Sequence, residues 1–349
     1  MKCGWANQHV SIDSTGVFRP CCGWRLMEDE VVVGSITDYI NSDWRKNLLE
    51  KLDNDQWPKG CKDCKLDEEI DSESLRTGAI RYNDPNYKDA EVKFGNMCNL
   101  ACAMCSPYNS SLIEKEYEKL KGQHRIFEVS DFPVRSFWYQ DPDKLKEIAR
   151  ELSSYDRIRF TGGEPTVNNY LIDFLTEVRK HNTDIIIKLT TNGNNWPNKL
   201  HELLKEFKTI VSVSIDAYGE KNNYIRYPSN WNKIEKNIDK MLELPMRKIE
   251  CGTTIASYNV HLMEELANWV HVKGFQQHSI DPVWRPEIFR PCNTTQEIKD
   301  RFEEFSKTYK PTQRIIKNVL AQGNGLQETI DFLKILDKSR NKDYKVLGL

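Results

Sequence analysis

Three closely spaced cysteines lie in residues 94–105, which run Phe94-Gly95-Asn96-Met97-Cys98-Asn99-Leu100-Ala101-Cys102-Ala103-Met104-Cys105. Three thiolates at the spacing C-x3-C-x2-C can hold three irons of a 4Fe–4S cluster and leave the fourth iron open to a small molecule. Electron-transfer clusters use four cysteines, and structural zinc sites use four ligands. No fourth Cys or His lies near this loop in the sequence. The loop therefore predicts a cluster with one open iron.

Strand-like and helix-like segments alternate after this loop. The strand-like segments are rich in β-branched residues, which suits strands of a parallel sheet that are buried on both faces. Amphipathic segments with helical spacing lie between them and are expected to pack against the sheet. Six such β–α units predict an α/β fold in which a parallel sheet curls into a partial (βα)6 barrel. The expected strands are 90–94, 157–160, 185–189, 210–215, 248–255 and 276–283.

Short polar motifs follow four of these strands, where the reactive groups of parallel barrels gather. The 157–160 strand leads into Gly162-Gly163-Glu164-Pro165. Its glycines let a ligand approach the backbone, and its glutamate can accept a hydrogen bond from an ammonium group, although a tight turn would also explain the glycines. Arg226 carries a guanidinium fork that suits a carboxylate, with a surface salt bridge as the alternative. The remaining motifs are Thr191-Asn192-Gly193, Ser214-Ile215-Asp216 and Thr254-Ile255-Ala256-Ser257-Tyr258-Asn259.

The cysteine spacing and the Gly-Gly-Glu-Pro element together resemble the radical S-adenosylmethionine (SAM) superfamily. The resemblance implies a 4Fe–4S cluster held by Cys98, Cys102 and Cys105, with SAM bound at the open iron. It also implies that one electron from the reduced cluster cleaves SAM to methionine and a 5′-deoxyadenosyl radical, which abstracts hydrogen from a substrate. The cofactors supply the difficult chemistry in such enzymes, and the protein supplies placement and excludes water.

The same resemblance implies a set of SAM contacts. The family usually has an aromatic residue before the third cysteine, near the adenine; Met104 stands there instead, and a thioether can also lie against an aromatic face. We expect Ser214 and Asp216 to touch SAM directly. The expected contacts are Gly162, Gly163, Glu164 and Pro165 for the amino group; Asn192, Ser214, Asp216 and Arg226 for the carboxylate and ribose; and Met104, Ile255, Ala256 and Asn259 around the adenine.

A second group of cysteines precedes the expected barrel. Clustered cysteines in an intracellular chain indicate metal binding rather than disulfides. A hairpin of 9–12 with 17–19 and a helix over 37–52 would bring the group together, and Cys22 competes with its neighbour as a ligand. The site suits a second 4Fe–4S cluster, with zinc as the alternative. The predicted ligands are Cys3, Cys21, Cys61 and Cys64.

This second group resembles the first half of a SPASM domain, or the smaller twitch domain, both of which hold auxiliary 4Fe–4S clusters. The later SPASM cysteines are absent, so the resemblance implies one auxiliary cluster. Such domains normally follow the barrel, whereas this one precedes it. The expected domains are an auxiliary-cluster domain at 1–89, the radical SAM partial barrel at 90–292 and a helical C-terminal extension at 293–349.

Composition narrows the range of partners. The net charge is −2 and the sequence pI is about 6.4, so bulk electrostatics favour neither nucleic acid nor an acidic membrane. The mean hydropathy is −0.66, no apolar run approaches membrane-spanning length, and the N-terminus lacks the apolar core of a signal peptide. We therefore expect a cytoplasmic protein.

Cys251 lies outside both cysteine groups, and we expect it to be a small, buried apolar residue rather than a metal ligand.

Substrate and partners follow only from the resemblance. Relatives with SPASM or twitch domains mostly modify peptides or proteins, so a peptide or protein substrate is expected, together with a flavodoxin or ferredoxin as the reductant. A radical SAM enzyme acting on a nucleotide, an RNA or a small metabolite, including by methyl transfer, is one alternative. A non-catalytic iron–sulfur electron-transfer protein is the other, although it would need no SAM pocket.

Overall fold

The computed structural model describes residues 2–24, 34–69, 73–78, 84, 86–128, 137–245 and 248–349. The chain forms two compact units. The first comprises Met1–Asn96, Pro133–Leu189 and Glu202–Thr209, and the second comprises Met97–Phe132, Thr190–His201 and Ile210–Leu349. None of the helices within the described ranges is long and apolar enough to cross a membrane.

Strands of the first unit lie in the order β2-β1-β3-β4-β5, and those that lie mainly in the second unit follow the order β6-β7-β8. The pairs β1–β3, β3–β4, β4–β5, β6–β7 and β7–β8 are parallel, whereas β1 and β2 form an antiparallel hairpin. The six strands expected from the sequence are β3 to β8, so the predicted α/β class with a parallel sheet is confirmed. The bounds are β1 His9–Ile12, β2 Phe18–Arg19, β3 Asp89–Val92, β4 Arg157–Phe160, β5 Ile186–Thr191, β6 Lys208–Ser214, β7 Lys248–Ile255 and β8 Gln277–Pro282.

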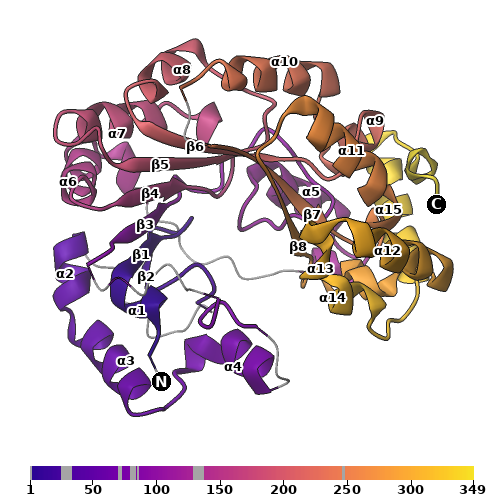
Figure 1. Cartoon of the computed structure of the whole chain (residues 1–349), viewed down its shortest axis with the longest axis horizontal. Coiled ribbons are helices and arrows are strands. Elements are labelled where there is room, and N and C mark those ends of the chain that lie inside the picture. The colour runs from indigo at the N-terminus through magenta and orange to yellow at the C-terminus, as the bar shows by residue number, and fades with distance from the viewer. Residues whose placement is uncertain are drawn as a thin grey trace. The chain divides into compact units, whose positions relative to one another are not determined.

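Helices separate the strands from β3 onwards, as the spacing predicts, and others precede and follow them (Figure 1). Those of the first unit are α1 Gly4–Gln8, α2 Ile36–Asn41, α3 Asp43–Asp53, α4 Lys62–Glu69, α6 Pro142–Leu152 and α7 Tyr170–Arg179. Those of the second are α5 Ser111–Leu120, α9 Glu220–Ile225, α10 Trp231–Leu242, α11 Met263–Lys273, α12 Gln296–Thr308, α13 Lys310–Gln313, α14 Ile316–Leu320 and α15 Gln327–Arg340. Helix α8 (Asn198–Leu204) belongs partly to each.

The predicted N-terminal hairpin is confirmed. Strand β1 pairs antiparallel with β2, and the Asp13 carboxylate closes the turn by accepting hydrogen bonds from the Thr15 and Val17 backbone N–H groups. Strand β1 also pairs in parallel with β3, which places Val10 beside Ala90. The segment before residue 89 therefore shares a sheet with the segment after it, whereas the sequence placed a domain boundary there.

The helix expected over 37–52 is divided in two. Ser42 has extended backbone, and its hydroxyl accepts a hydrogen bond from Arg45 N–H at 3.2 Å. A serine in this position caps the start of a new helix. Helix α2 therefore ends and α3 begins at Ser42, because the local cap outweighs the continuous apolar stripe on which the prediction rested.

The two faces of β3 and β4 differ in a way that the sequence analysis missed. One face is apolar: Phe94 stacks on Phe160, and both contact Phe174 of α7 edge-on. The opposite face carries buried charges, because Asp89 pairs with Arg157 and Arg159. The sequence predicts strands that are buried on both faces, and β3 and β4 are buried on both, but the buried side chains of one face are charged rather than apolar.

Candidate active site

The loop of Cys98, Cys102 and Cys105 lies in the second unit and is held by backbone hydrogen bonds. Ala101 N–H donates to the Tyr227 carbonyl, and Ala103 N–H donates to the Ile225 carbonyl at 2.8 Å. At the other end of the loop, the Ser110 hydroxyl donates to the Leu100 carbonyl and caps α5. These contacts place the Cys102 thiol in the interior and leave the other two partly exposed.

Burial dominates the chemistry of these thiols. It raises the pKa of both Cys102 and Cys105, and the neighbouring cysteine thiols raise that of Cys105 further. A thiol must lose its proton to bind a metal, so a positive group near the loop is needed to stabilise the thiolates. Arg226 is such a group: it lowers the pKa of Cys102 against the effect of burial, and its Nη1 lies 4.0 Å from Cys102 Sγ.

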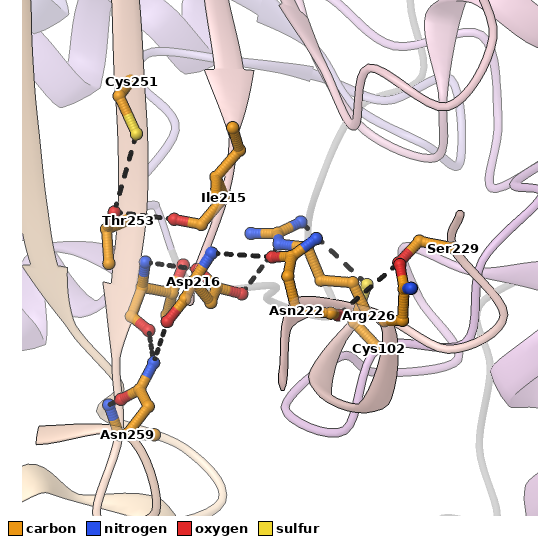
Figure 2. Close-up of polar contacts among 12 residues, drawn as sticks. Cys102, Ile215, Asp216, Asn222, Arg226, Ser229, Cys251, Thr253 and Asn259 are labelled. Atoms are coloured by element: carbon orange, nitrogen blue, oxygen red, sulfur yellow. Dashed lines mark hydrogen bonds and ion pairs between the residues drawn. The ribbon is translucent and has the colours of Figure 1, made fainter. Parts of the chain in front are cut away.

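Asp216, which follows β6, is an internal anchor. Figure 2 shows its carboxylate between the end of β7 and the Arg226 side chain. Oδ2 lies 2.7 Å from Arg226 Nε, and Oδ1 accepts a hydrogen bond from Thr254 N–H at 2.8 Å. The Asp216 side chain is fully buried. We expected this residue to contact SAM directly, but both oxygens already have protein partners, so the geometry favours a positioning role.

Asn259 joins the ends of β6 and β7. Its amide Nδ2 donates to the carbonyls of Asp216 and Thr254, and its Oδ1 accepts from Ala256 N–H at 2.7 Å. The side chain is fully buried. Asn259 therefore shapes the backbone of the predicted adenine region rather than offering a free amide to it.

Several other predicted residues are found in the second unit. Asn192 connects the end of β5 to the cysteine loop, because its Nδ2 donates to Asn99 Oδ1 at 2.7 Å. Met104 packs against the apolar cluster that contains Ala256. Ile255 is fully buried at the end of β7, and Ser214 is half-buried at the end of β6. The second unit thus gathers the cysteine loop with residues predicted at three strand ends.

The Gly162–Pro165 turn belongs to the first unit. Gly162 and Gly163 have φ of +71° and +53°, conformations that favour glycine. A Cβ at position 162 would lie 2.6 Å from Lys93 Cδ, so only glycine fits there without displacing that side chain. Glu164 is 2 % exposed, and its Oε1 accepts hydrogen bonds from the Thr166 backbone and hydroxyl. The turn is therefore tightly built, and its glutamate is oriented by its neighbour.

The N-terminal cysteines also share a site within the first unit. Its lining includes the aromatic side chains Trp5 and Trp57 and the cation Arg76. Burial raises the pKa of all four thiols, and repulsion from neighbouring cysteines adds to the effect at Cys3, Cys21 and Cys61, so that the pKa of Cys61 rises to about 12. The cysteines that line this pocket are Cys3, Cys21, Cys61 and Cys64.

Cys22 has different neighbours from Cys21. It is absent from the lining of the cysteine pocket, and the charges that act on its thiol are those of Glu91, Arg159 and Lys93. This separation favours Cys21 as the member of the pair that joins the other three thiols. Among the described residues, no three His, Cys, Asp or Glu side chains are arranged as ligands of a single metal ion.

A buried hydrogen-bond chain supports the end of β6. The Thr253 hydroxyl donates to the Ile215 carbonyl, so it accepts from His278 Nε2, and His278 Nδ1 in turn accepts from the Tyr309 hydroxyl. These partners require a neutral histidine with its proton on Nε2. Burial lowers the pKa of His278 to about 4.

This shift predicts a pH-dependent stability. The unfolded chain takes up a proton at His278 below about pH 6.5, whereas the folded chain does so only near its lower pKa of about 4. The folded state therefore loses stability as the pH is lowered from about 6.5 to about 4. We expect His278 to contribute about 2 kcal/mol to the loss between about pH 7 and about pH 5. Thermal unfolding should show that His278→Gln loses less stability than the unchanged protein over this pH range. His271→Gln, at an exposed position, is the control and should lose as much stability as the unchanged protein. Equal pH dependence in all three proteins would contradict the assignment.

Comparison with known proteins identifies the class. Residues 92–270 match the model of the radical SAM superfamily, and the chain belongs to that family. It is therefore a radical SAM enzyme that uses a 4Fe–4S cluster and SAM.

Among curated proteins, the chain is similar to GTP 3′,8-cyclase from Clostridium botulinum (strain Okra / Type B1), with 28 % identity over 165 residues, covering 47 % of this chain and 46 % of the relative. The chain thus matches about half the length of that relative.

Solved structures show a looser likeness. Native anSMEcpe with bound AdoMet aligns with a TM-score of 0.47 and 17 % identity, covering 65 % of this chain and 62 % of the other. Streptococcus suis SuiB bound to precursor peptide SuiA aligns with a TM-score of 0.44 and 13 % identity, covering 73 % of this chain and 60 % of the other. A likeness at this level says nothing about the substrate of this chain.

Proposed function

We propose that Cys98, Cys102 and Cys105 hold the catalytic 4Fe–4S cluster. The observation that carries this proposal is the buried Cys102 thiol facing a buried guanidinium on a loop fixed at both ends. Three thiols and an adjacent cation are a suitable donor set for a cluster with one open iron. When bound, the reduced cluster supplies the electron that cleaves SAM to methionine and the 5′-deoxyadenosyl radical. The chain's own residues fix the loop and keep water from its inner side.

The SAM contacts remain as predicted, with two changes of role. Gly162–Pro165 is proposed for the amino group, Arg226 with Ser214 and Asn192 for the carboxylate and ribose, and Met104 with Ile255 and Ala256 for the adenine. Asp216 and Asn259 act instead as positioning residues, because their polar atoms are used within the protein.

An auxiliary 4Fe–4S cluster is proposed in the N-terminal pocket. Its support is the pocket lined by the four predicted thiols, with Trp5 and Trp57 also in its lining. Four protein ligands would leave no iron open, so this cluster would relay electrons or stabilise the fold. Zinc bound by the same four thiols is the alternative.

Iron analysis tests this second site. We expect about eight irons per chain after anaerobic reconstitution with iron and sulfide, and about four in Cys61→Ala, because one cluster of two is lost. SAM cleavage by dithionite-reduced Cys61→Ala should continue. Cys22→Ala is the matched control and should keep both clusters. Four irons in the unchanged protein together with one bound zinc would contradict the auxiliary cluster.

For the substrate, we propose a peptide or protein. Support comes from the resemblance of the four-cysteine pocket to SPASM and twitch domains, whose enzymes mostly act on peptides. A nucleotide substrate is the second candidate, favoured by the similarity to a protein named GTP 3′,8-cyclase. A flavodoxin or ferredoxin is the proposed reductant, and the cytoplasm is the proposed location.

An extract experiment separates the two substrate classes. The reconstituted enzyme, with SAM and dithionite, is mixed with a low-oxygen host extract that has been treated with protease or with phosphatase, or is given GTP alone. If the substrate is a peptide or protein, protease treatment should abolish the stimulation of 5′-deoxyadenosine formation. Stimulation by GTP alone, or loss on phosphatase treatment, would favour the nucleotide.

A further inference from the structure

Cys102 and Arg226 lie opposite each other across a short backbone pairing. Ala101 N–H donates to the Tyr227 carbonyl and Ala103 N–H donates to the Ile225 carbonyl. A single residue lies between these two hydrogen bonds on each segment, Cys102 on one and Arg226 on the other. Residues paired in this way have side chains close enough to interact. The backbone therefore sets the approach of the guanidinium to the thiol, and the contact does not depend on a flexible surface side chain.

Asp216 determines which way the guanidinium points. Its carboxylate forms an ion pair with Arg226 Nε at 2.7 Å, and the same carboxylate accepts a hydrogen bond from the Thr254 N–H at 2.8 Å. The side chains of Arg226 and Asp216 are 10 % and 0 % exposed. With Nε fixed, Nη1 is directed at Cys102 Sγ, 4.0 Å away (Figure 2). Arginine has five N–H donors, so this contact leaves others for a SAM carboxylate.

Tyr258 adds a second buried donor to the same region. Its side chain is fully buried, and within the described part of the chain its hydroxyl has no hydrogen-bond partner. Tyr258 belongs to the same buried cluster as Ala101 and Ala103, the residues on either side of Cys102, and the charges of Asp216, Cys102 and Arg226 are among those that act on its hydroxyl. A buried hydroxyl without a partner is costly, which indicates that an acceptor absent from the protein itself belongs beside it. The sulfur atoms of a cluster are such acceptors.

We propose that Arg226, oriented by Asp216, and Tyr258 donate to the sulfur atoms of the cluster on its Cys102 side and raise its reduction potential. This inference rests on the proposed function, because it requires the cluster to be held by Cys102. Reduction adds one electron, taken from dithionite or from the protein reductant, and no bond is made or broken in that step. The added negative charge is stabilised by a nearby cation in a low-dielectric site, and hydrogen bonds to the sulfurs are a recognised control of the potential.

The potential of the SAM-binding cluster, titrated by EPR in the absence of SAM, tests this inference. Its signal is identified as the one that changes when SAM is added. We expect a more negative potential in Arg226→Gln, a smaller decrease in Arg226→Lys, and a decrease in Tyr258→Phe. Arg314→Gln is the matched control, because Arg314 forms an exposed ion pair with Asp281, and its potential should be unchanged.

Two outcomes would overturn the proposal. One is an unchanged potential in iron-loaded Arg226→Gln, with weaker SAM binding alone, since Arg226 would then serve only the carboxylate. The other is an unchanged potential in both Arg226→Lys and Tyr258→Phe. This second outcome decides the matter if Arg226→Gln does not take up iron. Absence of iron from the unchanged protein, or no 5′-deoxyadenosine from it, would instead count against the proposed function, so the two failures are distinguishable.

Discussion

Replacing Cys98, Cys102 or Cys105 with alanine should abolish formation of 5′-deoxyadenosine, down to the background without enzyme. Each of these thiols is expected to bind a separate iron, and two remaining ligands cannot hold a cluster whose fourth iron must stay open for SAM. The iron content should fall by about four per chain, which is one cluster. Anaerobic reconstitution followed by iron analysis and a 5′-deoxyadenosine assay measures both effects in the same samples.

Cys251 provides the matched control for this set. Its thiol is fully buried in β7 and lies 3.8 Å from the Thr253 hydroxyl. Cys251→Ala should keep its iron and its activity, at a small cost in packing. If Cys98→Ala kept full iron and formed 5′-deoxyadenosine at the unchanged rate, the assignment of the loop would be wrong.

The sequence predicted the strands well because each has a local signature. A run of β-branched residues bounded by glycine or polar residues is visible in one dimension, and β4 and β7 begin and end where it predicts. The N-terminal hairpin was predictable for the same reason. The grouping of the four N-terminal cysteines followed once the hairpin and the following helices were placed.

Interactions between distant residues were harder to predict. Asp89 and Glu91 alternate with apolar residues, as do Arg157 and Arg159, and this alternation could have indicated a charged face on each strand. Which acidic residue pairs with which arginine, however, follows only from the register in which β3 pairs with β4. The cations Lys93 and Arg159, together with a hydrogen bond from the Thr161 hydroxyl, outweigh burial and lower the pKa of Glu91 to about 2.

Asp216 illustrates the same limit at the candidate site. A motif at a strand end indicates that the residue is near the ligand, but not whether its oxygens are free. Here Arg226 is ten residues further along the chain and Thr254 lies on the next strand, and together they use the carboxylate. The distinction between a ligand contact and a positioning residue therefore needed the three-dimensional structure.

Replacing Asp216 with alanine should destabilise the protein by about 3–5 kcal/mol, because it leaves a buried guanidinium without its counter-charge. The Thr254 N–H loses its acceptor as well. Urea unfolding of the reconstituted protein, followed by circular dichroism, measures the change. As the control, Asp281→Ala breaks an ion pair whose side chains are 58 % and 67 % exposed, and it should cost less than about 1 kcal/mol.

A double-mutant cycle separates the ion pair from packing. Arg226→Met alone leaves the Asp216 carboxylate buried and unpaired, so it should also be strongly destabilising, whereas the double variant Asp216→Ala/Arg226→Met removes both charges and should lose less than the sum of the two single variants. Contacting charged residues couple by about 0.5–3 kcal/mol, and a coupling in the upper part of that range is expected for a fully buried pair. Strict additivity would contradict the role given to Asp216, because a carboxylate that orients a buried guanidinium cannot be energetically independent of it.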